Sequence, residues 1–226
     1  MNEALKQAAA ERAVGEIRDG MVVGLGTGST AEIAVELLGA RVAKGLKIRG
    51  VPTSERTASL AGRLGIPLIA AQDEWPAIDL AVDGADQVER GTLNLVKGLG
   101  GALLREKIVA RASARFVVVV DDSKLVDRLG GATPLPVEIL PFGQSATLRQ
   151  LERLGLQPRL RLAAGIPFLT DGGHHIADCG FAGIADVARL ETELSATVGV
   201  VETGLFLGLA AMVVVGRPDG VEVMVR

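Results

Sequence analysis

Residues 21–30 have the sequence MVVGLGTGST, in which a short apolar run passes into glycines that alternate with hydroxyl side chains. The apolar run predicts a strand over Met21–Gly26, and Ser29 is placed to cap a helix that continues to about Lys44. Glycines at such a junction let the backbone approach an anion, and the helix N-terminus points free N–H groups at it. The stretch therefore predicts a strand–loop–helix unit with a phosphate-binding loop.

This loop differs from the two commonest nucleotide-binding patterns. A P-loop requires a lysine before its serine or threonine, and Gly28 occupies that position. A dinucleotide fingerprint requires an acid at the end of the next strand, where Val51, Pro52 and Thr53 stand. A plain tight turn with a serine or threonine cap stays open as the alternative, although the hydroxyl groups favour phosphate binding.

Strand and helix patterns alternate on both sides of this unit. The predicted helices are Asn2–Asp19, Ser54–Leu64 and Ala102–Ala112, and the predicted strands are Lys47–Val51, Asp79–Val82 and Arg115–Val120. Such alternation predicts an α/β fold with a doubly wound, mostly parallel, Rossmann-like sheet. Because crossovers between parallel strands are right-handed, the loops at the strand ends gather at one edge, where ligands bind in these folds.

The pattern changes after residue 131. The elements that follow are a strand (Val137–Leu140), a helix (Gln144–Leu154), strands Pro158–Leu162 and Pro167–Thr170, a helix (Ala185–Leu194) and a strand (Thr197–Val201). This β-α-β-β-α-β order is typical of a ferredoxin-like α+β domain. Strands at Leu209–Val215 and Val221–Val225 are expected to return to the first sheet. We therefore predict a Rossmann-like catalytic domain at 1–131 and 205–226, with residues 132–204 inserted.

Composition excludes several classes of protein. The net charge of −3 and an aromatic content of 3% argue against a nucleic-acid partner. Charged residues interrupt any signal-peptide core in residues 1–14, and the apolar runs are too short to cross a bilayer. The single cysteine, Cys179, fits a reducing compartment. We expect a soluble, cytoplasmic protein that needs no membrane.

Polar residues follow four more of the predicted strands or their loops. Two carboxylates, Asp83 and Asp86, come after one strand, Lys124 follows another, and the hydroxyl groups of Thr53-Ser54 follow an earlier one. Lys97 precedes a glycine loop that leads into a helix, where Glu106 has apolar neighbours three and four positions away. Individually these residues could be turn residues, caps or solvent-facing ion pairs, with Arg105 or Lys107 as partners of the glutamate. Their convergence at one sheet edge favours a binding site with a proton-transferring carboxylate.

The histidine and cysteine residues do not form the pattern of a metal site or of a thiolate nucleophile. His174 and His175 are the only histidines, and adjacent residues on a strand point to opposite faces, so they cannot readily share a metal ion. Cys179 has no histidine at a strand end beside it, which argues against a thiolate nucleophile. We therefore predict no metal and no cofactor.

Five motifs resemble type A ribose-5-phosphate isomerases and stand in the order seen in that family. They are GLGTGST at 24–30, DGAD at 83–86, KGLGGALLREKI at 97–108, DDSKL at 121–125 and PLPVE at 134–138. The likeness extends from Lys6 to Leu207. It implies interconversion of D-ribose 5-phosphate and D-ribulose 5-phosphate through an enediolate, as in the non-oxidative pentose phosphate pathway, by a homodimer or a homotetramer without metal or nicotinamide.

The resemblance also implies roles for individual residues. Glu106 is implied as the base that moves a proton between C2 and C1, Asp83 and Asp86 bind sugar hydroxyls and assist ring opening, and Lys97 with the following amides holds the oxyanion. Lys6 is implied as a further phosphate contact. The implied substrate-binding residues are Thr27, Gly28, Ser29, Thr30, Asp83, Gly84, Ala85, Asp86, Lys97, Gly98, Leu99, Gly100 and Lys124.

Three positions depart from the family pattern. Leu99 replaces a glycine, Gln87 stands where an acid is common, and Asp122 stands where glutamate is usual. Two alternative functions also stay open. A non-catalytic sugar-phosphate sensor would need the loops but not Glu106, and a transferase of the CoA type would use a nucleophilic glutamate. An amino-sugar phosphate deaminase would need a histidine at a strand end, which the sequence does not offer.

Overall fold

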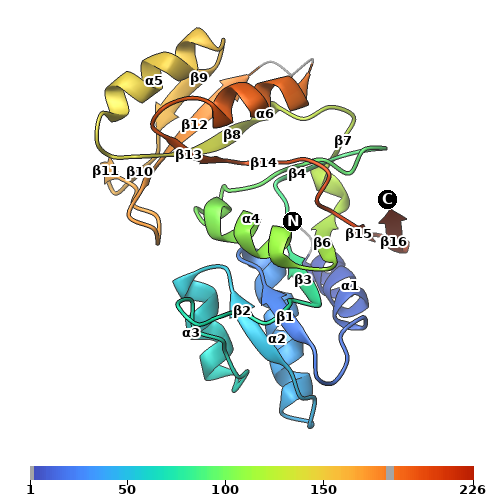
Figure 1. Cartoon of the computed structure of the whole chain (residues 1–226). Coiled ribbons are helices and arrows are strands. Elements are labelled where there is room, and N and C mark those ends of the chain that lie inside the picture. The colour runs from blue at the N-terminus through green and yellow to red at the C-terminus, as the bar shows by residue number, and fades with distance from the viewer. Residues whose placement is uncertain (1–2, 182–185) are drawn as a thin grey trace. The chain divides into compact units, whose positions relative to one another are not determined.

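A computed structural model describes residues 3–181 and 186–226. Contacts within the chain divide it into two compact units, whose elements are labelled in Figure 1. Unit 1 comprises Met1–Ala85, Arg105–Leu125 and Leu209–Arg226, and unit 2 comprises Asp86–Leu104 and Val126–Gly208. Both units are thus built from separate segments of the chain, and each is described by itself below.

Unit 1 contains a six-stranded sheet in the order β16-β15-β6-β3-β1-β2. Its strands are β1 (Val22–Leu25), β2 (Arg49–Pro52), β3 (Leu80–Asp83), β6 (Phe116–Asp121), β15 (Met212–Arg217) and β16 (Gly220–Val225). All neighbours pair in parallel except β15 and β16, which form an antiparallel hairpin. The Rossmann-like sheet and the return of the last strands to it are therefore confirmed.

Helices cover both faces of this sheet. They are α1 (Glu3–Val14), α2 (Ser29–Val42), α3 (Glu55–Arg63) and α4 (Leu103–Ala112), the last of which begins in unit 2 and continues into unit 1. Val23 and Val82 pack in one apolar cluster with residues of α1 and α2. The alternate residue Gly24 faces α4, since a Cβ placed on it would lie 2.5 Å from Cγ1 of Val109. In the described part of the chain, no helix is long and apolar enough to cross a membrane.

Two boundaries in unit 1 differ from the predicted ones. The first helix was expected to run to Asp19, but it ends at Val14, and Gly15 begins a series of turns; the expected start at Asn2 lies outside the described residues. The predicted cap Ser29 is the first helical residue. Gly28 is the N-cap, with a φ of 104° that only glycine adopts without strain.

Unit 2 contains a four-stranded antiparallel sheet in the order β13-β8-β12-β9. Its elements are β8 (Gly131–Ile139), α5 (Gln144–Arg153), β9 (Gln157–Leu160), β12 (His175–Phe181), α6 (Val187–Ser195) and β13 (Val200–Thr203). Leu151 of α5 and Leu194 of α6 are buried against Val137 and Ala177 of this sheet. The order β-α-β-β-α-β agrees with the ferredoxin-like prediction.

One strand of this sheet was wrongly placed from the sequence. The expected strand Pro167–Thr170 shares only Pro167 with a short hairpin of β10 (Leu162–Ala163) and β11 (Ile166–Pro167), and β12 takes its place in the sheet. The polar residues His175 and Asp178 interrupt the apolar pattern of β12, which concealed the strand. The predicted start of the following helix, Ala185, lies outside the described residues.

Short strands that the sequence did not predict form another sheet, in the order β14-β5-β4-β7. They are β4 (Gln87–Glu89), β5 (Leu95–Val96), β7 (Leu125–Val126) and β14 (Leu205–Phe206). Because β5 pairs with both β4 and β14, residues 86–104 group with unit 2. The sequence had placed this stretch with the Rossmann-like domain.

Replacing Gly216 with alanine is expected to destabilise the protein. A Cβ at this position would lie 2.0 Å from the carbonyl oxygen of Leu5, a backbone atom that cannot rotate away. Overpacking of this kind costs about 1–3 kcal/mol, and urea unfolding should report it. Gly62→Ala is the matched control: a Cβ there meets nothing within 4 Å, and alanine in a helix is favoured by about 0.5–1 kcal/mol. Equal stability of the two variants would contradict the packing described here.

Candidate active site

In unit 1, the ends of β1 and β3 meet at Asp83. Oδ1 of this aspartate accepts hydrogen bonds from the N–H of Thr27 at 3.1 Å and from the N–H of Gly84 at 2.7 Å. Gly26 must be glycine, since a Cβ on it would lie 2.3 Å from the same oxygen. Asp83 is 2% exposed. The first glycine loop, residues 26–30, is thus held against a buried carboxylate.

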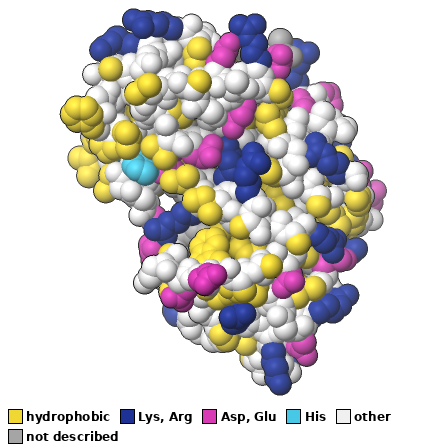
Figure 2. Space-filling view, in the orientation of Figure 1, with side chains coloured by type: hydrophobic (Ala, Val, Ile, Leu, Met, Phe, Trp, Pro, Cys, Tyr) yellow, Lys and Arg dark blue, Asp and Glu magenta, His cyan; other side chains and the backbone are white. Residues whose placement is uncertain are grey.

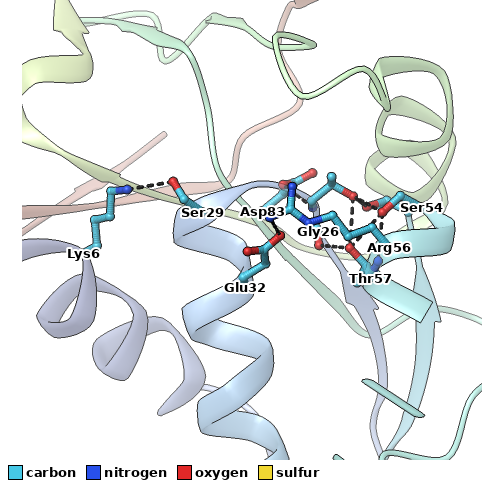
Figure 3. Close-up of polar contacts among 10 residues, drawn as sticks. Lys6, Gly26, Ser29, Glu32, Ser54, Arg56, Thr57 and Asp83 are labelled. Carbon is cyan, nitrogen blue, oxygen red and sulfur yellow. Dashed lines mark hydrogen bonds and ion pairs between the residues drawn. The ribbon is translucent and has the colours of Figure 1, made fainter. Parts of the chain in front are cut away.

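A cluster of hydroxyl groups supports this loop from α3 and the end of β2 (Figure 3). Oγ1 of Thr27 lies 2.7 Å from Oγ1 of Thr53 and donates to Oγ of Ser54 at 2.8 Å. Thr57 donates from Oγ1 to the carbonyl oxygen of Gly26 at 2.9 Å. The side chain of Thr27, predicted to bind substrate, is therefore turned inward and holds the loop. The sequence signal for this cluster was the run Thr53-Ser54 after a strand.

A cation lies at the N-terminus of α2. The buried Lys6 of α1 donates from Nζ to Oγ of Ser29 at 2.7 Å (Figure 3), and Ser29 is exposed at the first position of the helix. Thr30 follows it in the helix and is half-buried. An ammonium group, a hydroxyl group and free helical N–H groups together form an anion-binding arrangement. Lys124 lies in a short helical turn (Asp122–Lys124) after β6 of unit 1 and is half-buried.

The glutamate singled out from the sequence is buried. Glu106 is 4% exposed on α4, and its neighbours three and four positions away include Leu103, Val109 and Ala110, all buried. Nη1 of the neighbouring Arg105 lies 2.8 Å from Oε1 of Glu55. The interpretation of Glu106 as a solvent-facing surface residue was therefore wrong.

In unit 2, Asp86 holds the second glycine loop, residues 97–101. Oδ2 of Asp86 accepts a hydrogen bond from the N–H of Leu99 at 2.9 Å. The Leu99 side chain is 44% exposed and its φ is not positive, so this position does not require glycine. Gly98 and Gly101 do have positive φ, at 107° and 85°. The backbone of the loop therefore accommodates leucine at position 99 without a strained φ.

Lys97 is a buried lysine, at 2% exposure. Nζ of Lys97 lies 5.5 Å from the centroid of the Phe206 ring, a residue that the sequence motifs do not include. The backbone N–H of Lys97 donates to the carbonyl oxygen of Gly204. Gln87, the second departure from the family pattern, both donates to and accepts from the backbone of Gly130, at 2.8 and 2.7 Å. An ionised carboxylate at position 87 could only accept hydrogen bonds.

The histidines and the cysteine lie in unit 2, where each histidine has a side-chain partner and the cysteine is buried. Nδ1 of His174 lies 2.9 Å from Glu138 and Nδ1 of His175 lies 2.6 Å from Gln144, so their partners differ. Burial, and next the charge of Asp178, raise the pKa of the Cys179 thiol to about 12, which makes it a poor nucleophile. Across residues 3–181 and 186–226, no three His, Cys, Asp or Glu side chains form a candidate metal site.

Known proteins resemble this chain over its whole length. The profile of the family "Ribose 5-phosphate isomerase A (phosphoriboisomerase A)" matches residues 49–220. A ribose-5-phosphate isomerase A from Gloeobacter violaceus is 56% identical over 97% of this chain and 95% of its own.

Two solved structures support the same relationship. The ribose 5-phosphate isomerase A of Methanocaldococcus jannaschii, 41% identical, has a TM-score of 0.95 and covers 100% of both chains. A D-ribose-5-phosphate isomerase in complex with phospho-erythronic acid, 42% identical, has a TM-score of 0.95 with the same coverage. The chain belongs to the type A ribose-5-phosphate isomerase family.

Proposed function

We propose that this chain interconverts D-ribose 5-phosphate and D-ribulose 5-phosphate through an enediolate, with Glu106 as the proton-transferring base. The observation that carries the proposal is the buried carboxylate of Glu106, surrounded along its helix by apolar residues. A carboxylate shielded from water in this way can exchange a proton with a carbon atom of a bound sugar. A surface glutamate would have no such setting.

The N-terminal end of α2 is the proposed binding site for the phosphate. Lys6 and Ser29 already lie 2.7 Å apart there, and the first turn of the helix supplies free N–H groups. Lys124 is proposed as a second cation for the same phosphate. Binding energy from the phosphate, remote from the reacting carbons, would help to hold C1 and C2 in a reactive position.

The proposed reaction moves two hydrogens. The Glu106 carboxylate takes the proton from C2 of the open-chain aldose, and the C2–H electron pair forms the C1=C2 bond while the carbonyl pair moves onto O1. The protonated Glu106 then returns a proton to C1, and the O2 proton passes to O1. Lys97 and the N–H groups of the second glycine loop stabilise the charge on oxygen, while Asp83 and Asp86 bind hydroxyls and assist ring opening.

The ligand of one relative fits this scheme. Phospho-erythronic acid, present in a structure 42% identical to this chain, carries a planar, negatively charged carboxylate at the end of a phosphorylated chain, and an enediolate likewise has planar carbon atoms and a negative charge on oxygen. A site built to stabilise an enediolate is expected to bind such a compound more tightly than the substrate. The compound is therefore a suitable probe for this protein.

The direct test is to incubate the purified protein with ribose 5-phosphate and to measure ketose formation. A sugar-phosphate sensor would bind the compound without forming ketose, and a transferase would need a second substrate. Binding without turnover would refute the proposed activity.

Glu106→Gln is expected to retain the fold and to bind phospho-erythronic acid, but to lose most isomerisation. Glutamine is nearly isosteric, but its amide cannot accept the proton, and loss of a general base costs about 10²–10⁴-fold in rate. Ketose formation at saturating substrate measures the loss. Glu36→Gln, an exposed glutamate on α2, is the matched control and should behave as wild type. Full activity in folded Glu106→Gln would refute the role given to Glu106.

Ketose formed in deuterated water is expected to carry deuterium at C1, at least in part. The reason is that the carboxyl proton on Glu106 can exchange with solvent between the two transfers. Mass spectrometry of early product from unlabelled substrate measures this, with heat-inactivated protein as control. A metal-assisted hydride shift would instead transfer the C2 hydrogen intact. Complete transfer from C2-deuterated substrate would contradict the enediolate route.

A homodimer, with a homotetramer as the alternative, is the assembly we propose. Apolar side chains gather over the start of α5 and the β10–β11 hairpin of unit 2 (Figure 2). Phe142 is 93% exposed, and Ile166 and Leu169 are also exposed. Exposed apolar groups concentrated in this way commonly mark a protein interface. We also propose a cytoplasmic location, for which the neutral, buried thiol of Cys179 is suited.

Phe142→Asp is expected to weaken self-association, because the interface would then bury a charge. Light scattering coupled to size exclusion, over a range of protein concentrations, measures the mass of the assembly. Val225→Asp is the matched control, since Val225 is exposed at the end of β16 in unit 1. A monomeric wild type would refute the assembly, and an unchanged mass for Phe142→Asp would place the interface elsewhere.

A further inference from the structure

Arg161 contacts the second glycine loop, although none of the motifs recognised in the sequence includes it. It stands between β9 and β10 in unit 2. Its Nη1 donates hydrogen bonds to the carbonyl oxygens of Gly98 and Leu99, both at 3.0 Å. One guanidinium nitrogen thus bridges two consecutive peptide groups of the loop.

The guanidinium group is itself held from two sides. Nε donates to Oδ2 of Asp178 at 2.9 Å, and Nη2 pairs with the other oxygen of the same carboxylate. Cζ lies 5.8 Å from the centroid of the Phe168 ring. That ring also packs beneath the loop, since a Cβ on Gly101 would lie 2.6 Å from it. A bidentate pair and an aromatic contact fix the guanidinium in orientation as well as in position.

These contacts determine which way two peptide groups point. In a trans peptide the C=O and the N–H of the next residue point in opposite directions. The Gly98–Leu99 peptide is fixed at both ends, because its carbonyl oxygen faces Arg161 and its N–H donates to Asp86. The Leu99–Gly100 peptide has its carbonyl oxygen on Arg161, so the N–H of Gly100 points away from the guanidinium.

The N–H of Gly100 is thereby left available. No hydrogen bond joins it to any residue within 3–181 or 186–226, and Gly100 is exposed. A cation on the two carbonyl oxygens also polarises the peptide groups, which strengthens an N–H as a donor by about 10–30% per bond in a hydrogen-bonded chain. An exposed and polarised N–H that is fixed in direction is what an oxyanion-binding loop requires.

We propose that Arg161 is a positioning residue for the reaction: it fixes the Leu99–Gly100 peptide so that the N–H of Gly100 is directed at the oxyanion of the enediolate. This inference rests on the proposed isomerisation and adds a residue outside the family motifs. Without Arg161 the peptide can turn over, because glycine at position 100 tolerates either orientation. The N–H of Gly100 then stabilises the oxyanion less, while the groups that bind the phosphate are unaffected.

The test compares Arg161→Met with Arg159→Met. Both replace an arginine by an unbranched apolar side chain in the same segment, but Arg159 is exposed on β9. Removal of one oxyanion donor costs about 10²–10³-fold in kcat, and we expect a loss near the lower bound for Arg161→Met with little change in KM. Affinity for phospho-erythronic acid should fall in parallel with kcat/KM, and competition by inorganic phosphate should not change. Arg159→Met should match wild type in each measurement.

Several outcomes would overturn the inference. They are an unchanged kcat in folded Arg161→Met, or a higher KM at constant kcat, which indicates ordinary binding. If Arg161→Met does not fold, Arg161→Lys is measured instead, since lysine keeps the charge but cannot bridge both carbonyls and Asp178. Wild-type kcat in Arg161→Lys would equally refute the role. Absence of ketose formation by the wild type would refute the proposed function itself, which separates the two failures.

Discussion

The carboxylate of Asp83 joins the ends of β1 and β3, and the first glycine loop of unit 1 depends on that connection. One oxygen accepts two backbone N–H groups, one from each strand end, which requires the loop to approach within reach of a side chain. Only the absence of a Cβ at Gly26 allows this approach. The fixed loop then leads into Gly28, whose positive φ turns the chain into α2. The anion-binding helix terminus is thus a consequence of how an aspartate is packed.

The sequence predicted the large elements well, because they have clear periodicity. The parallel strands of unit 1 are continuous apolar runs, and the helices have spaced apolar residues or clear caps such as Ser54. Short strands gave no such signal: β4 and β5 have three and two residues. β12 was missed because His175 and Asp178 interrupt the expected alternation of apolar and polar residues. Phe168 and Thr170 are residue types common in strands, but they lie outside β11.

In the candidate site, the sequence predicted residues that belong to a regular side-chain pattern, but not contacts that depend on the fold. Spacing on a helix identified Glu106, because residues three and four apart share a face. It could not show that Thr27 faces Thr53 and Ser54, or that Asp86 binds the N–H of Leu99. Arg161 and Phe206 were missed for a further reason. They lie 62 and 109 positions along the chain from Leu99 and Lys97, and their roles arise only from sheet pairing in unit 2.

The packing of Leu5 against Gly216 has a consequence for the order of events during synthesis. The first helix contacts α2 and β6 as well as β15, and the part of its docking surface that lies on β15 does not exist until about 200 more residues have been made. At about 5–20 residues per second this interval is about 10–40 s. Throughout it α1, whose Ala9 and Ala13 are part of the core, can pack on α2 and β6 but not yet on β15. The packing of the first helix is therefore completed only after β15 has left the ribosome.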